Sequence, residues 1–172
     1  MKKQLFTALL TAALALTARA ETTAKLTGVH LCCKSCVKGA EKAVSTVTGA
    51  SIACDADAST ATITAPDDAT AQKAADALVA AGYFGKSENP AVKIVDNSGA
   101  KEGKVSTLEV DGVHLCCAKC VKAVDGAVKG VTGVSSQDAT KNAEKFEVKG
   151  DFDGKAVFTA LQNAGLTGKA GK

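Results

Sequence analysis

A nine-residue stretch rich in cysteine occurs twice in this chain of 172 residues. "GVHLCCKSC" occupies residues 28–36, and "GVHLCCAKC" occupies residues 112–120, which is 84 positions later. The likeness continues downstream, where "LVAAGYFGK" at residues 78–86 matches "LQNAGLTGK" at residues 161–169. Such self-similarity is the signature of a repeated structural unit. The chain is therefore predicted to fold as two copies of one small domain.

Apolar residues that follow each cysteine stretch recur every three or four positions, which is the spacing of one buried helix face. Glycines 49 and 133 come after these segments and are expected to end the helices. The apolar positions are Val37, Ala40, Val44 and Val47 in the first copy and Val121, Val124, Val128 and Val131 in the second.

The remaining elements of each copy follow from alternation and from helix-start signals. "SIACDA" and "ATITA" are predicted to pair as strands with Ile52 and Ile63 inward, and "KFEVKG" is the corresponding strand of the second copy. Pro66-Asp67-Asp68 is predicted to start a second helix, and a short strand follows near residues 83–86. The fold class is thus α+β, with two ferredoxin-like βαββαβ domains in tandem.

The first twenty residues have the three-part layout of a secretory signal. Two lysines open the chain, an apolar stretch spans residues 5–16, and Ala18-Arg19-Ala20 provides a cleavage site. An uncleaved membrane anchor is the alternative, although the apolar stretch is shorter than the ~20 residues of a membrane span. The predicted domains are a signal peptide at 1–20, a first domain at 21–88, a linker at 89–103 and a second domain at 104–172.

Within the linker, "AVKIV" is predicted to add a strand to one of the sheets. The lysine-rich signal indicates a bacterial protein that is periplasmic or secreted. Removing it takes away three of the 21 basic residues and none of the 18 acidic ones, so the rest of the chain is neutral. With neither a basic stripe nor many aromatic residues, nucleic-acid binding is not expected. No membrane span is expected after signal cleavage.

Six of the seven cysteines lie in the two repeated stretches. Cysteines that staple an exported protein are usually spread so that disulfides close long loops, whereas these would close almost nothing. Cys33-x-x-Cys36 and Cys117-x-x-Cys120 each lie where a strand leads into a helix, where backbone N–H groups favour a thiolate. Thiolates at this spacing suit soft ions such as Cu(I) or Zn(II). A plain disulfide within each motif is the alternative.

The cysteine motif and its downstream residues resemble the heavy-metal-associated domain. That family includes copper chaperones, the amino-terminal regions of metal-pumping ATPases and the periplasmic mercury-binding protein, and it carries G-M-x-C-x-x-C followed by apolar residues at helical spacing. Ala40-Glu41, Val124-Asp125 and the later Ala81-Gly82-Tyr83 fit the rest of its pattern. The resemblance implies that Cys33, Cys36, Cys117 and Cys120 are metal ligands. It also implies that a metal-transporting ATPase or another metal-exchange protein is a partner.

This chain departs from the family pattern at the residues that precede each C-x-x-C. Leu31 and Leu115 stand in place of the family methionine, which keeps an apolar residue beneath the loop. The family glycine is replaced by a histidine, and a second cysteine precedes the first ligand. The possible extra ligands are Cys32, Cys116, His30 and His114. Two thiolates alone suit Cu(I) or Hg(II), whereas three thiolates, or thiolates with imidazole, suit Zn(II), Cd(II) or three-coordinate Cu(I).

The sequence predicts an exported protein, not an enzyme, that carries or sequesters soft metal ions, Cu(I) first, at two C-x-x-C sites. The main alternative is a periplasmic thiol–disulfide oxidoreductase. A thioredoxin-like enzyme is disfavoured because its motif needs a larger βαβ framework. It also needs a cis-proline opposite the cysteines, and the second copy has no proline, because the two in the chain are Pro66 and Pro90. An interaction module without bound metal is a third alternative. Cys54 is predicted to be a buried free thiol.

Overall fold

The computed structural model describes residues 20–171, and the predicted signal peptide therefore lies, apart from its last residue, outside the described residues. Each half of the chain runs strand–helix–strand–strand–helix–strand. The first half contains β1 (Thr22–Thr27), α1 (Lys34–Val44), β2 (Ser51–Asp55), β3 (Thr60–Ala65), α2 (Asp68–Ala80) and β4 (Lys86–Ser87). The second half contains β5 (Lys104–Asp111), α3 (Ala118–Lys129), β6 (Val134–Gln137), β7 (Lys145–Asp153), α4 (Gly154–Asn163) and β8 (Lys169–Ala170).

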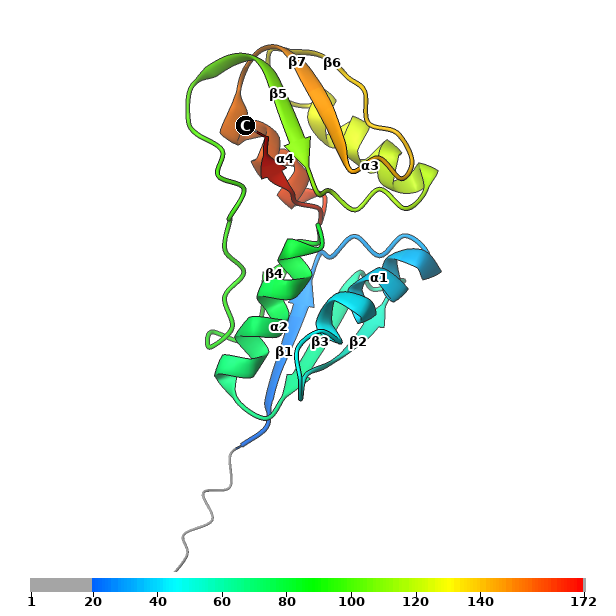
Figure 1. Cartoon of the computed structure of the whole chain (residues 1–172), viewed down its shortest axis with the longest axis vertical. Coiled ribbons are helices and arrows are strands. Elements are labelled where there is room, and N and C mark those ends of the chain that lie inside the picture. The colour runs from blue at the N-terminus through cyan, green and yellow to red at the C-terminus, as the bar shows by residue number, and fades with distance from the viewer. Residues whose placement is uncertain (1–19, 172) are drawn as a thin grey trace, which may run out of the picture.

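Each half builds its own four-stranded antiparallel sheet. The strand orders are β2-β3-β1-β4 and β6-β7-β5-β8, so the first strand of each half lies in the middle of its sheet. This is the element order that the sequence predicts. Figure 1 shows the two halves stacked along the long axis, with the segment between β4 and β5 running along one side.

The alternating strands and the helices enclose the core of each half. In β1, Thr22, Ala24 and Leu26 are buried, while Thr23 and Lys25 between them are exposed. Helix α1 buries Cys36, Ala40 and Val44, which are spaced four residues apart on one face. Val47 comes after the end of α1 and is only half-buried, so the predicted helix face is shorter than the sequence spacing suggests.

The second helix of each half begins at an aspartate, as predicted for the first copy. Asp67 caps α2 by accepting a hydrogen bond of 2.8 Å from the Thr70 backbone N–H. Asp153 caps α4 in the same way, at 3.0 Å from the Ala156 N–H. A capping carboxylate satisfies one of the backbone donors that the first helical turn leaves unpaired. Both helices therefore start at fixed points and pack on their sheets.

The strand predicted for "AVKIV" is wrong. Residues 91–95 form no strand, because the backbone of Lys93 bonds to a side chain instead of a sheet edge. The Gln72 amide of α2 accepts from the Lys93 N–H and donates to the Lys93 carbonyl, each at 2.8 Å.

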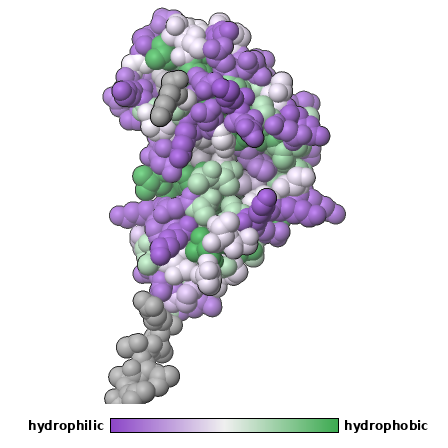
Figure 2. All heavy atoms as spheres, viewed as in Figure 1, coloured by the Kyte–Doolittle hydropathy of each residue, from purple (hydrophilic) through white to green (hydrophobic). Residues whose placement is uncertain are grey.

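Figure 2 shows hydrophilic side chains over much of both halves, on the face that is turned toward the viewer. Within residues 20–171, Val95 is the one large hydrophobic residue that is exposed, at 59%.

Cys54 is a free thiol, as predicted, but it is less buried than predicted. Cys54 and Ile52 do share one face of β2, as expected, but both are half-buried. Strand β2 is the edge of its sheet and pairs only with β3, so its inward face is covered on one flank. The Cys54 thiol packs against the core without entering it, and burial raises its pKa.

Candidate metal centre

The loops after β1 and β5 carry the repeated stretch toward the junction between the two halves. Each loop begins at a glycine with φ of 73°, Gly28 or Gly112, a left-handed conformation that glycine adopts without strain. Leu31 and Leu115 then point into the core, at 2% and 4% exposure. The apolar residue expected beneath each cysteine loop is thus present in both halves.

Each C-x-x-C lies at the start of a helix. Cys33 and Cys117 are the residues before the first turns of α1 and α3, in extended conformation, and neither side chain makes a capping hydrogen bond. Cys36 and Cys120 lie within the first turns and are fully buried. The turn brings the two sulfurs of each motif to 3.6 Å and 3.7 Å.

The two cysteine stretches meet in one place. The six-cysteine cluster consists of Cys32, Cys33, Cys36, Cys116, Cys117 and Cys120. Each of its sulfurs lies 3.5–3.9 Å from sulfurs of the other half as well as from a sulfur of its own half. All six thiols are free, and so is Cys54. The sequence treats the two motifs as separate sites, whereas the structure brings them into one cluster.

Backbone hydrogen bonds hold the two halves together beneath the cluster. The N–H of His30 donates to the Gly165 carbonyl at 3.2 Å, and the N–H of Thr167 donates to the Gly82 carbonyl at 3.0 Å. Gly82 and Gly165 have positive φ, and a Cβ at either would collide with the backbone of the other half. These two glycines therefore permit the close approach that unites the cluster.

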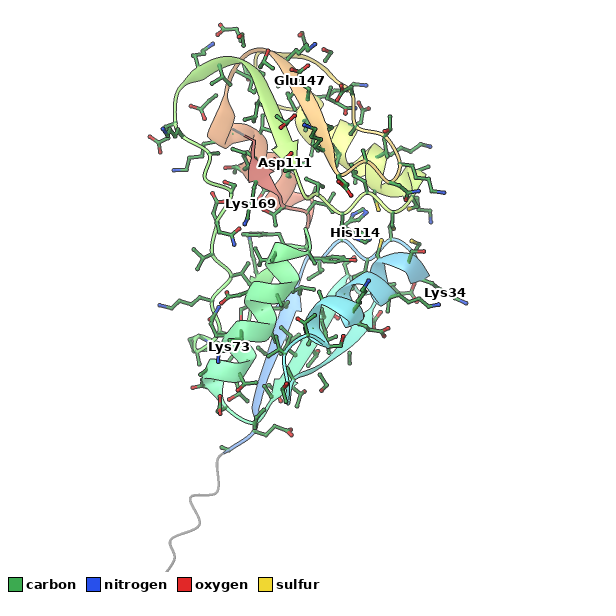
Figure 3. All side chains as sticks on the ribbon, in the orientation of Figure 1. Lys34, Lys73, Asp111, His114, Glu147 and Lys169 are labelled. Atoms are coloured by element: carbon green, nitrogen blue, oxygen red, sulfur yellow. The ribbon has the colours of Figure 1, made fainter. Side chains whose placement is uncertain are left out.

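Tyr83 adds a side-chain link at this junction. Its hydroxyl donates a hydrogen bond of 2.7 Å to the Cys36 carbonyl, and its ring stacks on His114 of the other half with centroids 4.6 Å apart. Figure 3 shows His114 between the two halves. The cysteine motif does not predict Tyr83 as a site residue. The sequence does carry one signal of its role, because the two copies differ here, with Tyr83 in the first and Leu166 at the equivalent position of the second.

The two histidines lie beside the cluster, His30 near Cys32 and Cys120 and His114 near Cys36. Within residues 20–171, the Nε2 atoms of both His30 and His114 are buried without a hydrogen-bond partner. A ring nitrogen of His30 lies within 4.8 Å of the sulfurs of Cys32 and Cys120, which makes it a possible third ligand there. Burial lowers the pKa of His30, which favours the neutral imidazole that binds metals.

The six sulfurs also compete for protons. A hydrogen bond from Cys120 lowers the pKa of Cys36 far below that of a free thiol, and the pKa of Cys120 is raised in return. The nearby backbone N–H of Cys120 lowers the pKa of Cys117 to about 6. Burial raises the pKa of Cys32 to about 12 and that of Cys116 as well. The pKa is thus lowered at Cys36 and Cys117 and raised at Cys32, Cys116 and Cys120, and a lowered pKa favours the thiolate, which is the form that binds soft metals.

Several groups of three side chains in this cluster could hold a metal ion. In each group the ligand atoms lie within 4.8 Å of one another, and three of the groups consist of sulfur alone. The all-sulfur groups are Cys32–Cys33–Cys117, Cys33–Cys36–Cys116 and Cys116–Cys117–Cys120. Two of these groups combine sulfurs from both halves. All four primary ligands predicted from the sequence, and both extra cysteines, belong to these groups, whereas His114 belongs to none of those described.

Comparisons with known proteins assign no family. The chain matches no protein-family model and no curated protein sequence. Among solved structures, the N-terminal soluble domains of Bacillus subtilis CopA align with 13% identity over 89% of this chain and 95% of that chain. The TM-score is 0.31, and at this value the likeness assigns neither fold nor function to this chain.

Proposed function

We propose that this chain is an exported, non-enzymatic protein that binds soft metal ions, Cu(I) first, and carries or sequesters them. The observation that carries the proposal is the cluster of six free thiols at 3.5–3.9 Å spacing. Soft thiolate ligands select Cu(I), Zn(II) and similar ions. Cys33, Cys36, Cys117 and Cys120 would be the primary ligands, and Cys32 and Cys116 would extend the set.

The surroundings of the cluster favour bound cations. Two helices begin beside the sulfurs, and a helix start favours negative charge and so favours thiolates. Leu31, Leu115 and Tyr83 are buried around the loops and keep water away from the inner sulfurs. Uncompensated thiolates so close together would repel one another, so cations between them would stabilise the cluster.

The proposal includes export to the bacterial periplasm and metal exchange with a second protein. The layout of residues 1–20 supports export to the bacterial periplasm. None of the helices in residues 20–171 has the length and apolar character that a membrane crossing requires. Exposed lysines border the helix starts, and Figure 3 shows Lys34 extending outward from α1. This charge would suit an acidic surface on a metal-transporting ATPase or another metal-exchange protein.

A thiol–disulfide oxidoreductase is the second candidate. It is favoured by Cys117, whose pKa is lowered to about 6 and which lies 3.7 Å from the Cys120 sulfur. A thiolate at neutral pH with a neighbouring thiol is the arrangement that disulfide exchange uses. The fully buried Cys120 and the packing of the two motifs against each other disfavour the larger substrate of such an enzyme.

Metal competition separates the two candidates. The reduced, anaerobic chain would be offered Cu(I), Zn(II) and Hg(II) together, and the complexes would be weighed by native mass spectrometry. Retained soft ions are expected, with stepwise loss when Cys33/Cys36 and then Cys117/Cys120 become serine. Cys54→Ser is the matched control and should bind as the wild type does. Failure to retain any ion, together with catalysed disulfide exchange, would reject metal binding in favour of the enzyme.

A further inference from the structure

The six sulfurs are arranged as a closed set in which both halves take part. We propose that the six-cysteine cluster is one polynuclear centre, in which six thiolates bridge four soft monovalent cations such as Cu(I). The proposal rests on the metal-binding function proposed above. It replaces two separate C-x-x-C sites by a single cage to which both halves contribute equally.

The bridging arrangement of the cage follows from the distances between the six sulfurs. Besides the three all-sulfur groups described above, the sulfurs of Cys32, Cys36 and Cys120 form a fourth, with sulfur–sulfur distances of 3.6, 3.7 and 3.7 Å. Every sulfur then belongs to two of the four groups, and any two groups share one sulfur. Four cations in these groups would be joined pairwise by six bridging thiolates, with no sulfur left over.

The sizes of the groups fit metal–sulfur bonds. The sulfurs of Cys33, Cys36 and Cys116 are separated by 3.6, 3.7 and 3.5 Å. An ion at the centre of a triangle with these edges lies about 2.1 Å from each sulfur, close to the ~2.3 Å of a zinc–thiolate bond. Expansion of each edge by a few tenths of an ångström, on replacing protons by metal, would match that length. This group and the group of Cys32, Cys36 and Cys120 are therefore already spaced for three-coordinate ions. In the other two groups, all sulfurs lie within 4.8 Å of one another.

Charge and coordination number favour a soft monovalent ion. Each group offers three sulfurs, whereas structural Zn(II) takes four ligands in a tetrahedron. Four monovalent cations against six thiolates leave a net charge of −2 on the centre. The two helix starts beside it favour negative charge of this kind. Four divalent ions would leave the same buried place with a positive charge facing the positive ends of α1 and α3.

The cage gives the doubled cysteine a role. Cys32 occurs in two of the four groups and Cys116 occurs in the other two. Without these two residues, each group would keep only two sulfurs, while both C-x-x-C pairs would remain intact. His30 lies beside Cys32 and Cys120, where it can support the fourth group. The residues at which this chain leaves the family pattern are thus the ones that would close the cage.

The wild-type test is a Cu(I) titration. The reduced chain would be titrated anaerobically with chelator-buffered Cu(I) and followed by native mass spectrometry. The proposal expects a monomer that passes from the metal-free form to a four-copper form, with little of the one-, two- and three-copper forms. Saturation at one or two coppers, or four coppers held only between two chains, would overturn it. A chain that binds no copper would reject the proposed function itself, which is a different result.

The decisive variant is Cys32→Ser combined with Cys116→Ser. It should bind at most two coppers per chain, a twofold loss, because both C-x-x-C pairs remain. Cys54→Ser carries the same chemical change outside the cluster and should keep four. Circular dichroism of the metal-free proteins would establish that each is folded, and Cys32→Ser alone provides a milder change that should also lose the four-copper form. If the double variant still binds four coppers, the bridging role of Cys32 and Cys116 is refuted.

Discussion

The two halves of this chain share their element order and cysteine pattern, but they use aromatic side chains differently. The second half packs Phe146, Phe152 and Phe158 into its own core. The first half fills the corresponding space largely with alanine and leucine, and it places its buried aromatic residue, Tyr83, at the junction beneath the cysteines. The difference indicates that the second half contributes more core packing, while the first contributes the side chain that links the halves.

The largest expected effect lies in the aromatic core of the second half. Phe152 is fully buried, and Phe152→Ala should lower the free energy of unfolding by ~3–5 kcal/mol because it leaves a cavity. Chemical denaturation followed by circular dichroism measures this loss. Leu78→Ala, in the first half, is the comparison and should cost ~2–5 kcal/mol. A clearly larger loss at Leu78 would contradict the assignment of the main packing contribution to the second half.

The next largest loss of stability is expected at the glycines that let the two halves approach each other closely. A Cβ on Gly82 would lie 2.5 Å from the Gly112 carbonyl oxygen and from the His114 nitrogen, at a φ of +88°. Gly82→Ala should therefore destabilise the junction by ~1–3 kcal/mol and reduce the amount of Cu(I) bound. Gly99→Ala also changes a glycine of positive φ, but its Cβ would meet nothing within 4 Å.

The Gly99 variant thus separates the cost of backbone strain from the cost of collision. If Gly82→Ala and Gly99→Ala lost the same stability and both bound the wild-type amount of copper, close approach at Gly82 would not hold the cluster together.

A smaller effect is expected where the halves differ most. Tyr83→Phe keeps the ring that stacks on His114 and removes the hydroxyl that donates to the Cys36 carbonyl. The loss should be ~1 kcal/mol, the net value of one hydrogen bond. Tyr83→Leu copies the residue of the second half and should cost more, because the stacking is lost as well. Equal stability of the two variants would show that the ring contributes nothing at the junction.

The smallest effect on the metal centre is expected from the helix cap that both halves share. Asp67→Ala removes the hydrogen bond to the Thr70 N–H and should cost ~1 kcal/mol of stability. Copper binding should be unchanged, because α2 begins beside the start of β1, at the end of the first half away from the cysteine loops (Figure 1). Asp67→Asn retains a capping acceptor and should recover most of the stability. A loss of bound copper in Asp67→Ala would indicate that the centre depends on global stability and not on the junction.

Local patterns predicted the elements of each half. The spacing of Val37, Ala40, Val44 and Val47 predicts the helix, although α1 buries only Ala40 and Val44 of these four, together with Cys36. Pro66-Asp67-Asp68 predicts the capped start of α2. These features depend on contacts within one helix or between neighbouring strands. Residues 91–95 are wrongly predicted as a strand. The backbone of Lys93 bonds to the side chain of Gln72, 21 residues earlier, and the alternation of apolar residues gives no information about such a partner.

The sequence predicts the individual cysteine motifs, but it does not predict that the two motifs meet in one cluster. Residue types and spacing identify the cysteines and the helix starts. Their union depends on how the two halves pack, through the backbone approach at Gly82 and Gly165 and the stacking of Tyr83 on His114. Those contacts join residues that are far apart in the sequence, and a pattern read within one copy carries no information on them. The family pattern, with one ion at each C-x-x-C, likewise predicts two centres.

X-ray absorption of the Cu(I)-loaded chain tests the single shared centre most directly. The predicted spectrum shows three sulfur neighbours for each copper and a second copper at short distance, because the bridging thiolates bring the ions together. A spectrum with two sulfur neighbours for each copper and no copper neighbour would contradict the shared centre and show two independent C-x-x-C sites.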